Sequence, residues 1–166
     1  MPEWRYIIAV GSNLGDRQAA ISRAAELLNA SGIGRIEAQS TLIETTAVGG
    51  PPGQGDFLNG AWIVASDFGP HQLLMELQRI ECACGRVRTV PWGPRTIDLD
   101  LIMRDDGVAV VSPILTLPHP RFCERPFVLK PLLEIATHWP MIQRFNFPLL
   151  SLYLLFFLFP LCVEQL

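Results

Sequence analysis

The order of strand-like and helix-like segments constrains the fold of this chain more than any other feature. Short apolar, β-rich runs alternate with two longer runs in which apolar residues recur at helical spacing. Their β-α-β-β-α-β order predicts an α+β fold, a ferredoxin-like antiparallel sheet with both helices on one face and an extra hairpin. The expected strands are 4–10, 34–45, 57–65 and 96–103, and the expected helices are 17–30 and a segment that begins at Pro70 and ends at Gly85.

Local signals support these boundaries. Asp16 is placed to cap the first helix, and Gly32 supplies its end. The core-facing residues of the second helix are expected to be Leu73, Leu77, Ile80 and Cys84. Beyond the fourth strand, Asp106-Gly107 predicts a hairpin turn into 108–111. A Pro-rich loop over 113–126 and a short helix over 127–136 are expected to follow.

Charge and composition argue against a nucleic-acid-binding protein. The net charge is −3 and charged residues make up 17% of the chain, whereas a nucleic-acid binder normally has a strong basic excess. The basic residues are nevertheless unusual, because all but Lys130 are Arg. The planar guanidinium matches phosphate oxygens, so this bias fits phosphate recognition. A codon preference for Arg explains it equally well, and the positions of the Arg residues must decide.

Cysteine usage and the N-terminal residues favour a cytoplasmic protein. None of the four Cys residues forms a CxxC pair, and Cys82 and Cys84 point apart on a helix. We therefore expect reduced, structural cysteines. The N-terminal residues contain neither a basic region nor an apolar run long enough for a signal peptide.

The C-terminal segment differs from the rest. Residues 149–163 are almost unbroken apolar sequence, but they are fewer than the roughly 18–20 needed to span a bilayer, and Pro160 interrupts them. A core helix or a hydrophobic docking segment is favoured over a membrane anchor. We therefore expect a domain over 1–138 and an atypical apolar segment over 139–166.

Asp98 and Asp100 are the first candidates for chemistry. On a strand, residues i and i+2 project from the same face, about 6.6 Å apart at their Cα atoms. Carboxylates on such a base can converge on two cations, and magnesium prefers oxygen ligands. By itself the Asp-Leu-Asp pattern is weak, because an alternating strand with a solvated acidic face explains it as well.

Basic residues flank this acidic pair. Arg86, Arg88 and Arg95 precede it in one loop, and His119 and Arg125 follow it. A polyphosphate bridged by metal ions needs carboxylates on the metal side and Arg on the oxygen side. Taken alone, the Arg residues are also explained by a solvated surface loop, and His119 is also explained by a structural histidine.

Phe57 and Asn59 lie at i and i+2 on the third strand and share a face. An aromatic ring beside a carboxamide suits a flat heterocycle, which one residue stacks on and the other hydrogen-bonds at its edge. From chemistry alone, core packing plus an Asn at a strand end is the favoured interpretation. No P-loop or protein-kinase motif is present, so any use of ATP requires another scaffold.

Taken together, these segments resemble the 6-hydroxymethyl-7,8-dihydropterin pyrophosphokinase family of folate biosynthesis. The resemblance runs in family order over about residues 5–136, and WGPRTIDLD is its most specific part. The segments that carry it are AVGSNLGDR (9–17), ETTAVGG (44–50), DFLNGA (56–61), QRIECACGRVR (78–88), WGPRTIDLDLI (92–102) and LPHPRFCERPFVLKPLLEIA (117–136).

The resemblance implies transfer of pyrophosphate from ATP to the hydroxymethyl-dihydropterin, with AMP and the pterin diphosphate as products. It implies two Mg²⁺ ions on Asp98 and Asp100, and catalytic roles for these residues and for Arg86 and Arg95. The implied ATP-binding residues are Leu74, Gln78, Glu81, Arg86, Arg88, Arg95, Thr116, His119 and Arg125. The implied pterin-binding residues are Thr45, Val48, Phe57, Asn59, Trp92 and Phe127.

Two other hypotheses remain open at this point. A catalytically weakened pterin- or nucleotide-binding protein of the same fold is supported by Pro91, where the family commonly has a basic residue, and by the apolar C-terminal segment. A membrane-associated module would use 149–163. We expect small-molecule partners, no nucleic acid, no membrane and a monomer.

Overall fold

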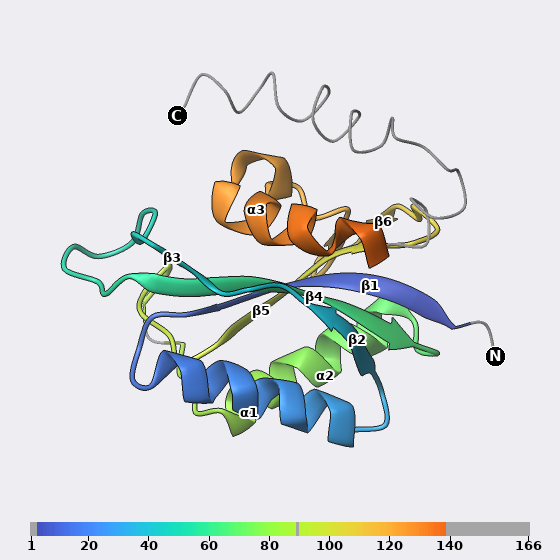
Figure 1. The fold of residues 1–166 in the computed structure, drawn as a ribbon, viewed down its shortest axis with the longest axis horizontal. Helices are drawn as coiled ribbons and strands as arrows, with labels where there is room; N and C mark the ends of the chain where they lie inside the picture. Colours follow the sequence, from blue (N-terminus) through green and yellow to red (C-terminus); the bar gives the residue numbers. More distant parts are fainter. Residues whose placement is uncertain (1–2, 89, 139–166) are drawn as a thin grey trace.

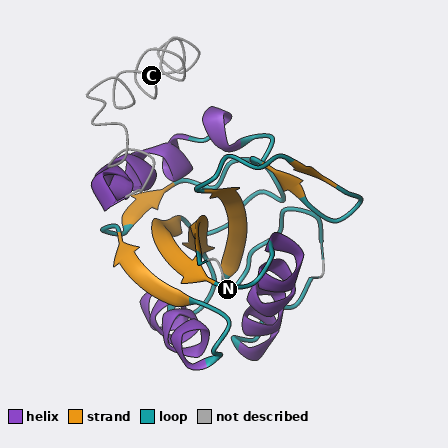
Figure 2. Cartoon of the chain, turned by 90° about the vertical axis from the view of Figure 1, so that its right-hand side faces the viewer, coloured by secondary structure: helices purple, strands orange, loops and turns teal. Residues whose placement is uncertain are grey.

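The computed structural model describes residues 3–88 and 90–138. A five-stranded antiparallel sheet lies between two helical layers, with α1 and α2 on one face and α3 on the other (Figure 1; Figure 2). The strand order is β2-β4-β1-β5, with β3 paired to β4. This order and pairing confirm the ferredoxin-like prediction. The sheet strands are β1 (Trp4–Ser12), β2 (Arg35–Gln39), β3 (Ile43–Thr45), β4 (Phe57–Ser66) and β5 (Asp98–Arg104).

The two predicted helices form because local signals and buried stripes agree. The Asp16 carboxylate accepts a hydrogen bond from the Ala19 amide at 3.0 Å and caps α1 (Arg17–Ala30). In α2 (Pro70–Ala83), Pro70 occupies the first turn, where its missing N–H costs nothing. Leu73, Leu77 and Ile80 are buried as predicted, whereas Cys84 is only partly buried at the edge of the core.

Strand β5 separates the core from the candidate chemistry. Leu99 and Leu101 pack into the core beneath α1 and α2. Asp98 and Asp100 therefore project to the opposite face, because successive side chains alternate. Farther along this strand, Ile102 packs with Val128 and Leu132 of α3 (Pro126–Ile135) in a second core.

The prediction of one strand over 34–45 was wrong. The segment forms β2 and β3, with a register shift against β4 between Ile36 and Ala38. Between the two strands, the Thr41 amide and hydroxyl donate to the Glu134 carboxylate of α3 at 2.9 and 2.7 Å. The Thr41 amide is therefore bound to α3, which explains why the sheet ladder does not continue through this residue.

The predicted hairpin was also wrong in its pairing. The turn exists, but the Val108 amide donates to the Asp106 carboxylate at 3.1 Å instead of to a strand. Within the described residues, β6 (Val110–Val111) pairs with β7 (Thr116–Leu117) and not with β5. The expected Pro-rich loop thus contains β7 and a short 3-10 helix, Phe122–Glu124. A second one, Ala136–His138, follows α3.

Some sequence predictions fall outside the described residues. The apolar segment 149–163 and Cys162 are among them. Cys82 and Cys84 are free cysteines in the structure, and reduced thiols stay a prediction. Over residues 3–88 and 90–138, no helix combines the length and the apolar character needed to cross a bilayer.

Candidate active site

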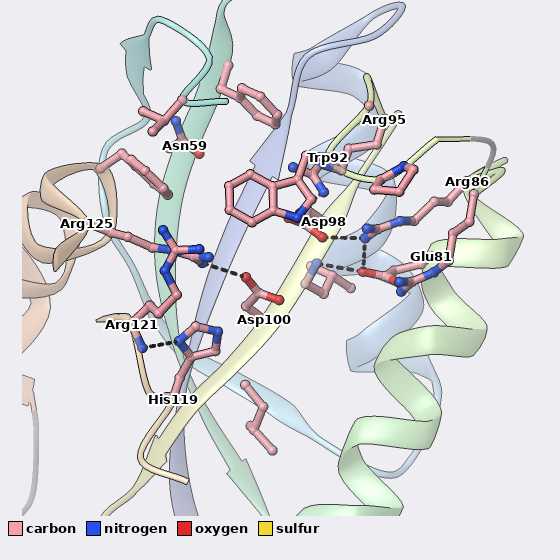
Figure 3. Close-up of a pocket in the computed structure, with 18 of the residues that line it drawn as sticks. Asn59, Glu81, Arg86, Trp92, Arg95, Asp98, Asp100, His119, Arg121 and Arg125 are labelled. Atoms are coloured by element: carbon pink, nitrogen blue, oxygen red, sulfur yellow. Dashed lines mark hydrogen bonds and ion pairs between the residues drawn. The ribbon is translucent and has the colours of Figure 1, made fainter. Parts of the chain in front are cut away.

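A cavity of about 1070 Å³ opens on the face of the sheet that carries Asp98 and Asp100. It is bounded by α2, β5, the loop 46–55, the loop 86–95 and the segment between β7 and α3 (Figure 3). Every residue assigned a role from the sequence lines this one cavity. They are Thr45, Val48, Phe57, Asn59, Leu74, Gln78, Glu81, Arg86, Arg88, Trp92, Arg95, Asp98, Asp100, Thr116, His119, Arg125 and Phe127.

Each carboxylate of the acidic pair faces arginine. Asp98 accepts a hydrogen bond from Arg86 and lies 3.5 Å from Nη1 of Arg95. Asp100 lies 3.4 Å from Nη1 of Arg125 (Figure 3). Burial, followed by the charge of Asp98, raises the pKa of Asp100 to about 6. Burial and the neighbouring Asp98 thus outweigh the stabilising effect of Arg125 on the ionised Asp100 carboxylate.

This donor set fits magnesium. Two carboxylates on one face supply hard oxygen ligands, and the negative charge of Asp98 next to Asp100 is of the sign that a bound cation offsets. In the part of the chain that the structure describes, no group of three or more His, Cys, Asp or Glu side chains could hold a metal. A hard cation here must take its remaining ligands from water and phosphate, as Mg²⁺ commonly does.

Glu81 joins the arginines to the sheet. This residue of α2 is 4% exposed, and its carboxylate accepts from Arg86, from Nη2 of Arg88 at 3.2 Å and from the Leu99 amide at 2.8 Å. Burial is the main cause that raises the pKa of Glu81, while the Leu99 amide and Arg86 act in the opposite direction. Arg86 is thus held between two carboxylates, Glu81 and Asp98.

His119 presents one defined face to the site. The Arg121 amide donates to Nδ1 of His119 at 3.2 Å, so the proton of the neutral ring resides on Nε2. Burial and, second, the charge of Arg125 lower the pKa of His119, which favours that neutral ring. His119 lies beside Asp100 in Figure 3 and can donate one hydrogen bond from Nε2 to a bound anion.

The other end of the cavity suits a flat ring. The Arg95 guanidinium lies over Phe57, 5.2 Å from its centroid, and that of Arg125 lies 5.8 Å from the centroid of Phe127. Asn59 is 6% exposed, and its amide nitrogen donates to the Thr45 hydroxyl at 2.7 Å. The carboxamide is therefore fixed in one orientation, with two aromatic side chains lining the same cavity.

Trp92 joins the two loops that border the cavity. Its backbone lies in the left-handed region at φ 59°, which costs a bulky residue free energy. The Gln54 amide donates to the carbonyls of Trp92 and Gly49, both at 3.1 Å. The Arg121 guanidinium lies 5.0 Å from the centroid of the indole ring. A Cβ on Gly49 would lie 2.9 Å from that ring, so the close packing requires glycine.

Three of the residues that shape the site escaped the sequence analysis. Gln54 and Arg121 contact Trp92, and Asn13 lies in the turn between β1 and α1. The Asn13 side chain accepts from the Arg95 amide at 2.8 Å and donates to the Gly55 carbonyl at 3.2 Å. Each of these residues contacts a loop that is distant from it in the sequence. The signal available in the sequence was that Asn13 and Gln54 lie in Gly-rich turns near the motifs.

Comparison with known proteins identifies the family of this chain. Residues 7–137 match the family described as 7,8-dihydro-6-hydroxymethylpterin-pyrophosphokinase. The chain belongs to this family. The match covers the described fold from residue 7 to residue 137, including every residue that lines the acidic and aromatic ends of the cavity.

Several curated proteins are similar over most of this chain. The 2-amino-4-hydroxy-6-hydroxymethyldihydropteridine pyrophosphokinase of Bacillus subtilis is 42% identical over 131 residues, which cover 78% of this chain and 76% of that protein. The Synechocystis protein of the same name is 41% identical, over 80% of this chain and 67% of its own length. The mitochondrial folate synthesis bifunctional protein of pea is 43% identical over 78% of this chain. This chain spans about a quarter, 24%, of the pea protein.

Proposed function

We propose that this protein transfers the pyrophosphoryl group of ATP to the hydroxymethyl group of 6-hydroxymethyl-7,8-dihydropterin, a step of folate biosynthesis. One observation carries the proposal. A single cavity holds a carboxylate pair surrounded by arginines at one end and an aromatic pair with a fixed carboxamide at the other. The products are AMP and the pterin diphosphate.

The ATP polyphosphate occupies the basic end of the cavity in this proposal. Arg86, Arg95 and Arg125 neutralise phosphate charge, and His119 donates its Nε2–H to a phosphate oxygen. The remaining nucleotide contacts fall to residues of α2, the loop 86–95 and the segment after β6. They are Leu74, Gln78, Arg88 and Thr116.

Asp98 and Asp100 would hold two Mg²⁺ ions together with the phosphates and water. When bound, these cations supply charge neutralisation and alignment of the phosphate chain. The arginines around them contribute in the same way. Catalysis therefore consists mainly of positioning and electrostatic stabilisation, because this kind of transfer leaves little covalent chemistry to the protein.

The pterin would lie between Phe57 and Phe127, and Asn59 would hydrogen-bond its edge. Thr45 and Val48 contribute from the adjoining strand and loop, and Trp92 covers the substrates. The hydroxymethyl oxygen attacks the β-phosphorus, and the bond from that phosphorus to the oxygen bridging it to the α-phosphorus breaks. AMP leaves with the bridging oxygen, and the hydroxyl proton is lost to solvent.

The nucleotide product tests this proposal directly. The protein is incubated with ATP, Mg²⁺ and 6-hydroxymethyl-7,8-dihydropterin, and the nucleotides are separated by chromatography. We expect AMP in a 1:1 ratio to consumed pterin, and no AMP when either Mg²⁺ or the pterin is omitted. Formation of ADP would indicate transfer of a single phosphoryl group, and pterin binding without any product would indicate a weakened binding protein.

Gly11→Ala is expected to weaken pterin binding selectively. A Cβ at Gly11 would lie 2.9 Å from Oδ1 of Asn59 and 3.5 Å from Cδ1 of Phe57, so it displaces the carboxamide. Loss of well-placed hydrogen bonds should raise KM for the pterin about tenfold. KM for ATP should stay within about twofold, because no nucleotide contact is disturbed.

Gly69→Ala is the matched control for this variant. Its Cβ would meet only Oε1 of Gln72, at 3.9 Å, in ordinary contact. Equal KM values for the pterin in wild type and Gly11→Ala would contradict the placement of the ring beside Asn59.

A cytoplasmic location and a monomeric state remain predictions, testable by fractionation and by light scattering.

A further inference from the structure

Beside Asp98, the open edge of β5 is held by side chains instead of by another strand. Strand β5 pairs with β1 along one edge, Gly11 opposite Asp98 and Ala9 opposite Asp100. Along the other edge, the Ile97 carbonyl accepts from Nη1 of Arg86 at 3.1 Å, and the Leu99 amide donates to Oε1 of Glu81 at 2.8 Å.

These two backbone groups are the pair that an antiparallel neighbour would bind. In such a ladder, the carbonyl of residue i and the amide of residue i+2 point to the same side. Here a guanidinium supplies the donor and a carboxylate supplies the acceptor, and the two are hydrogen-bonded to each other. The Glu81–Arg86 pair therefore fixes the backbone on both sides of Asp98.

Glu81 is poorly suited to bind nucleotide directly. It is 4% exposed, and its two carboxylate oxygens accept from Arg86, Arg88 and the Leu99 amide. Its negative charge would also repel a polyphosphate. The same charge holds two arginines that line the phosphate end of the cavity.

We propose that Glu81 is a positioning residue, not a nucleotide ligand. Through the Leu99 amide it fixes the strand segment from which both Asp98 and Asp100 project, and through Arg86 and Arg88 it sets the direction of two cations. This inference rests on the proposed pyrophosphoryl transfer. It predicts that Glu81 affects the rate of the reacting complex more than the affinity for ATP.

Two variants separate the two contacts of Glu81. Glu81→Gln keeps an oxygen acceptor for the Leu99 amide and loses the charge that holds the arginines, whereas Glu81→Ala loses both. Loss of one strand contact should speed hydrogen exchange of the Leu99 amide about tenfold in Glu81→Ala and leave it protected in Glu81→Gln. This readout, by NMR of the ¹⁵N-labelled protein, does not depend on activity.

Turnover should follow the same order. We expect kcat to fall about tenfold in Glu81→Gln and about 100-fold in Glu81→Ala, since small misplacements of reacting groups have such effects. The Kd of α,β-methylene-ATP, which cannot be cleaved at the reacting bond, should rise less than about fivefold in both. Glu76→Gln, in the same helix and paired only with Arg79 among the described contacts, should match wild type.

The opposite pattern would overturn the proposal. A direct ligand would show weakened analogue binding by more than about tenfold in both variants, kcat near that of wild type and an unchanged Leu99 amide. Failure of the proposed function is recognised separately, because wild type would then form no AMP in the same assay. The prediction for hydrogen exchange of the Leu99 amide holds whether or not the protein forms AMP.

Discussion

Asp98→Asn and Asp100→Asn should each reduce Mg²⁺-dependent AMP formation at least about 1000-fold without unfolding the protein. Asparagine keeps the size of the side chain and removes the charge that holds the cations. Both residues point away from the core that Leu99 and Leu101 fill, so the fold does not depend on them. Steady-state kinetics at saturating ATP and pterin, over a range of Mg²⁺ concentrations, measure the effect.

Stability should separate from activity in these variants. Because burial and the charge of Asp98 raise the pKa of Asp100 to about 6, ionising this residue lowers the stability of the folded protein, and the full loss is present above about pH 6. Asp100→Asn should therefore keep or increase the free energy of unfolding at pH 8. Asp67→Asn, an exposed carboxylate beyond the end of β4, controls for a general loss of charge. Near-normal turnover in either site variant would disprove the metal assignment.

Arg86→Met should cause the largest loss of stability among the arginine variants. Arg86 and Glu81 are both nearly buried, with side-chain exposures of 8% and 5%. Removing the guanidinium leaves the Glu81 carboxylate buried beside only Arg88 and the Leu99 amide. Breaking a buried pair in this way costs about 3 kcal/mol, which urea unfolding measures as a lower midpoint with an unchanged slope.

A second substitution distinguishes charge burial from loss of packing. Arg86→Met with Glu81→Gln removes the uncompensated charge and should recover most of the lost stability, while activity stays at least about 100-fold below wild type. Arg79→Met breaks an exposed pair with Glu76 and should cost less than about 0.5 kcal/mol. An Arg86→Met protein as stable as wild type, or a double variant no more stable than the single one, would contradict the account.

Predictions from the sequence succeeded where local chemistry decides the structure. The first helix begins and ends where Asp16 and the apolar stripe indicate, and the Asp-Leu-Asp alternation places both carboxylates on the cavity side. They failed where a distant residue competes for the backbone. Glu134 binds the Thr41 amide across 93 residues of chain, and Asp106 takes the Val108 amide, so neither segment pairs as its pattern suggested.

The candidate site was predictable in its residues but not in its connections. Motif matching identified residues that all line one cavity. It could not identify how Gln54 and Arg121 contact Trp92, because these contacts form between loops without a periodic pattern. Nor could it separate a proposed ligand such as His119 from a proposed positioning residue such as Glu81, since burial and hydrogen-bond partners support that distinction.

ATP labelled with ³²P at the β-phosphorus tests the central claim most directly. After a single turnover with Mg²⁺ and 6-hydroxymethyl-7,8-dihydropterin, products are separated by chromatography and counted. We predict that the label moves from the nucleotide to the pterin and that the AMP formed is unlabelled. Label that remains in the nucleotide as ADP, while the pterin gains a single phosphate, would contradict the proposed transfer.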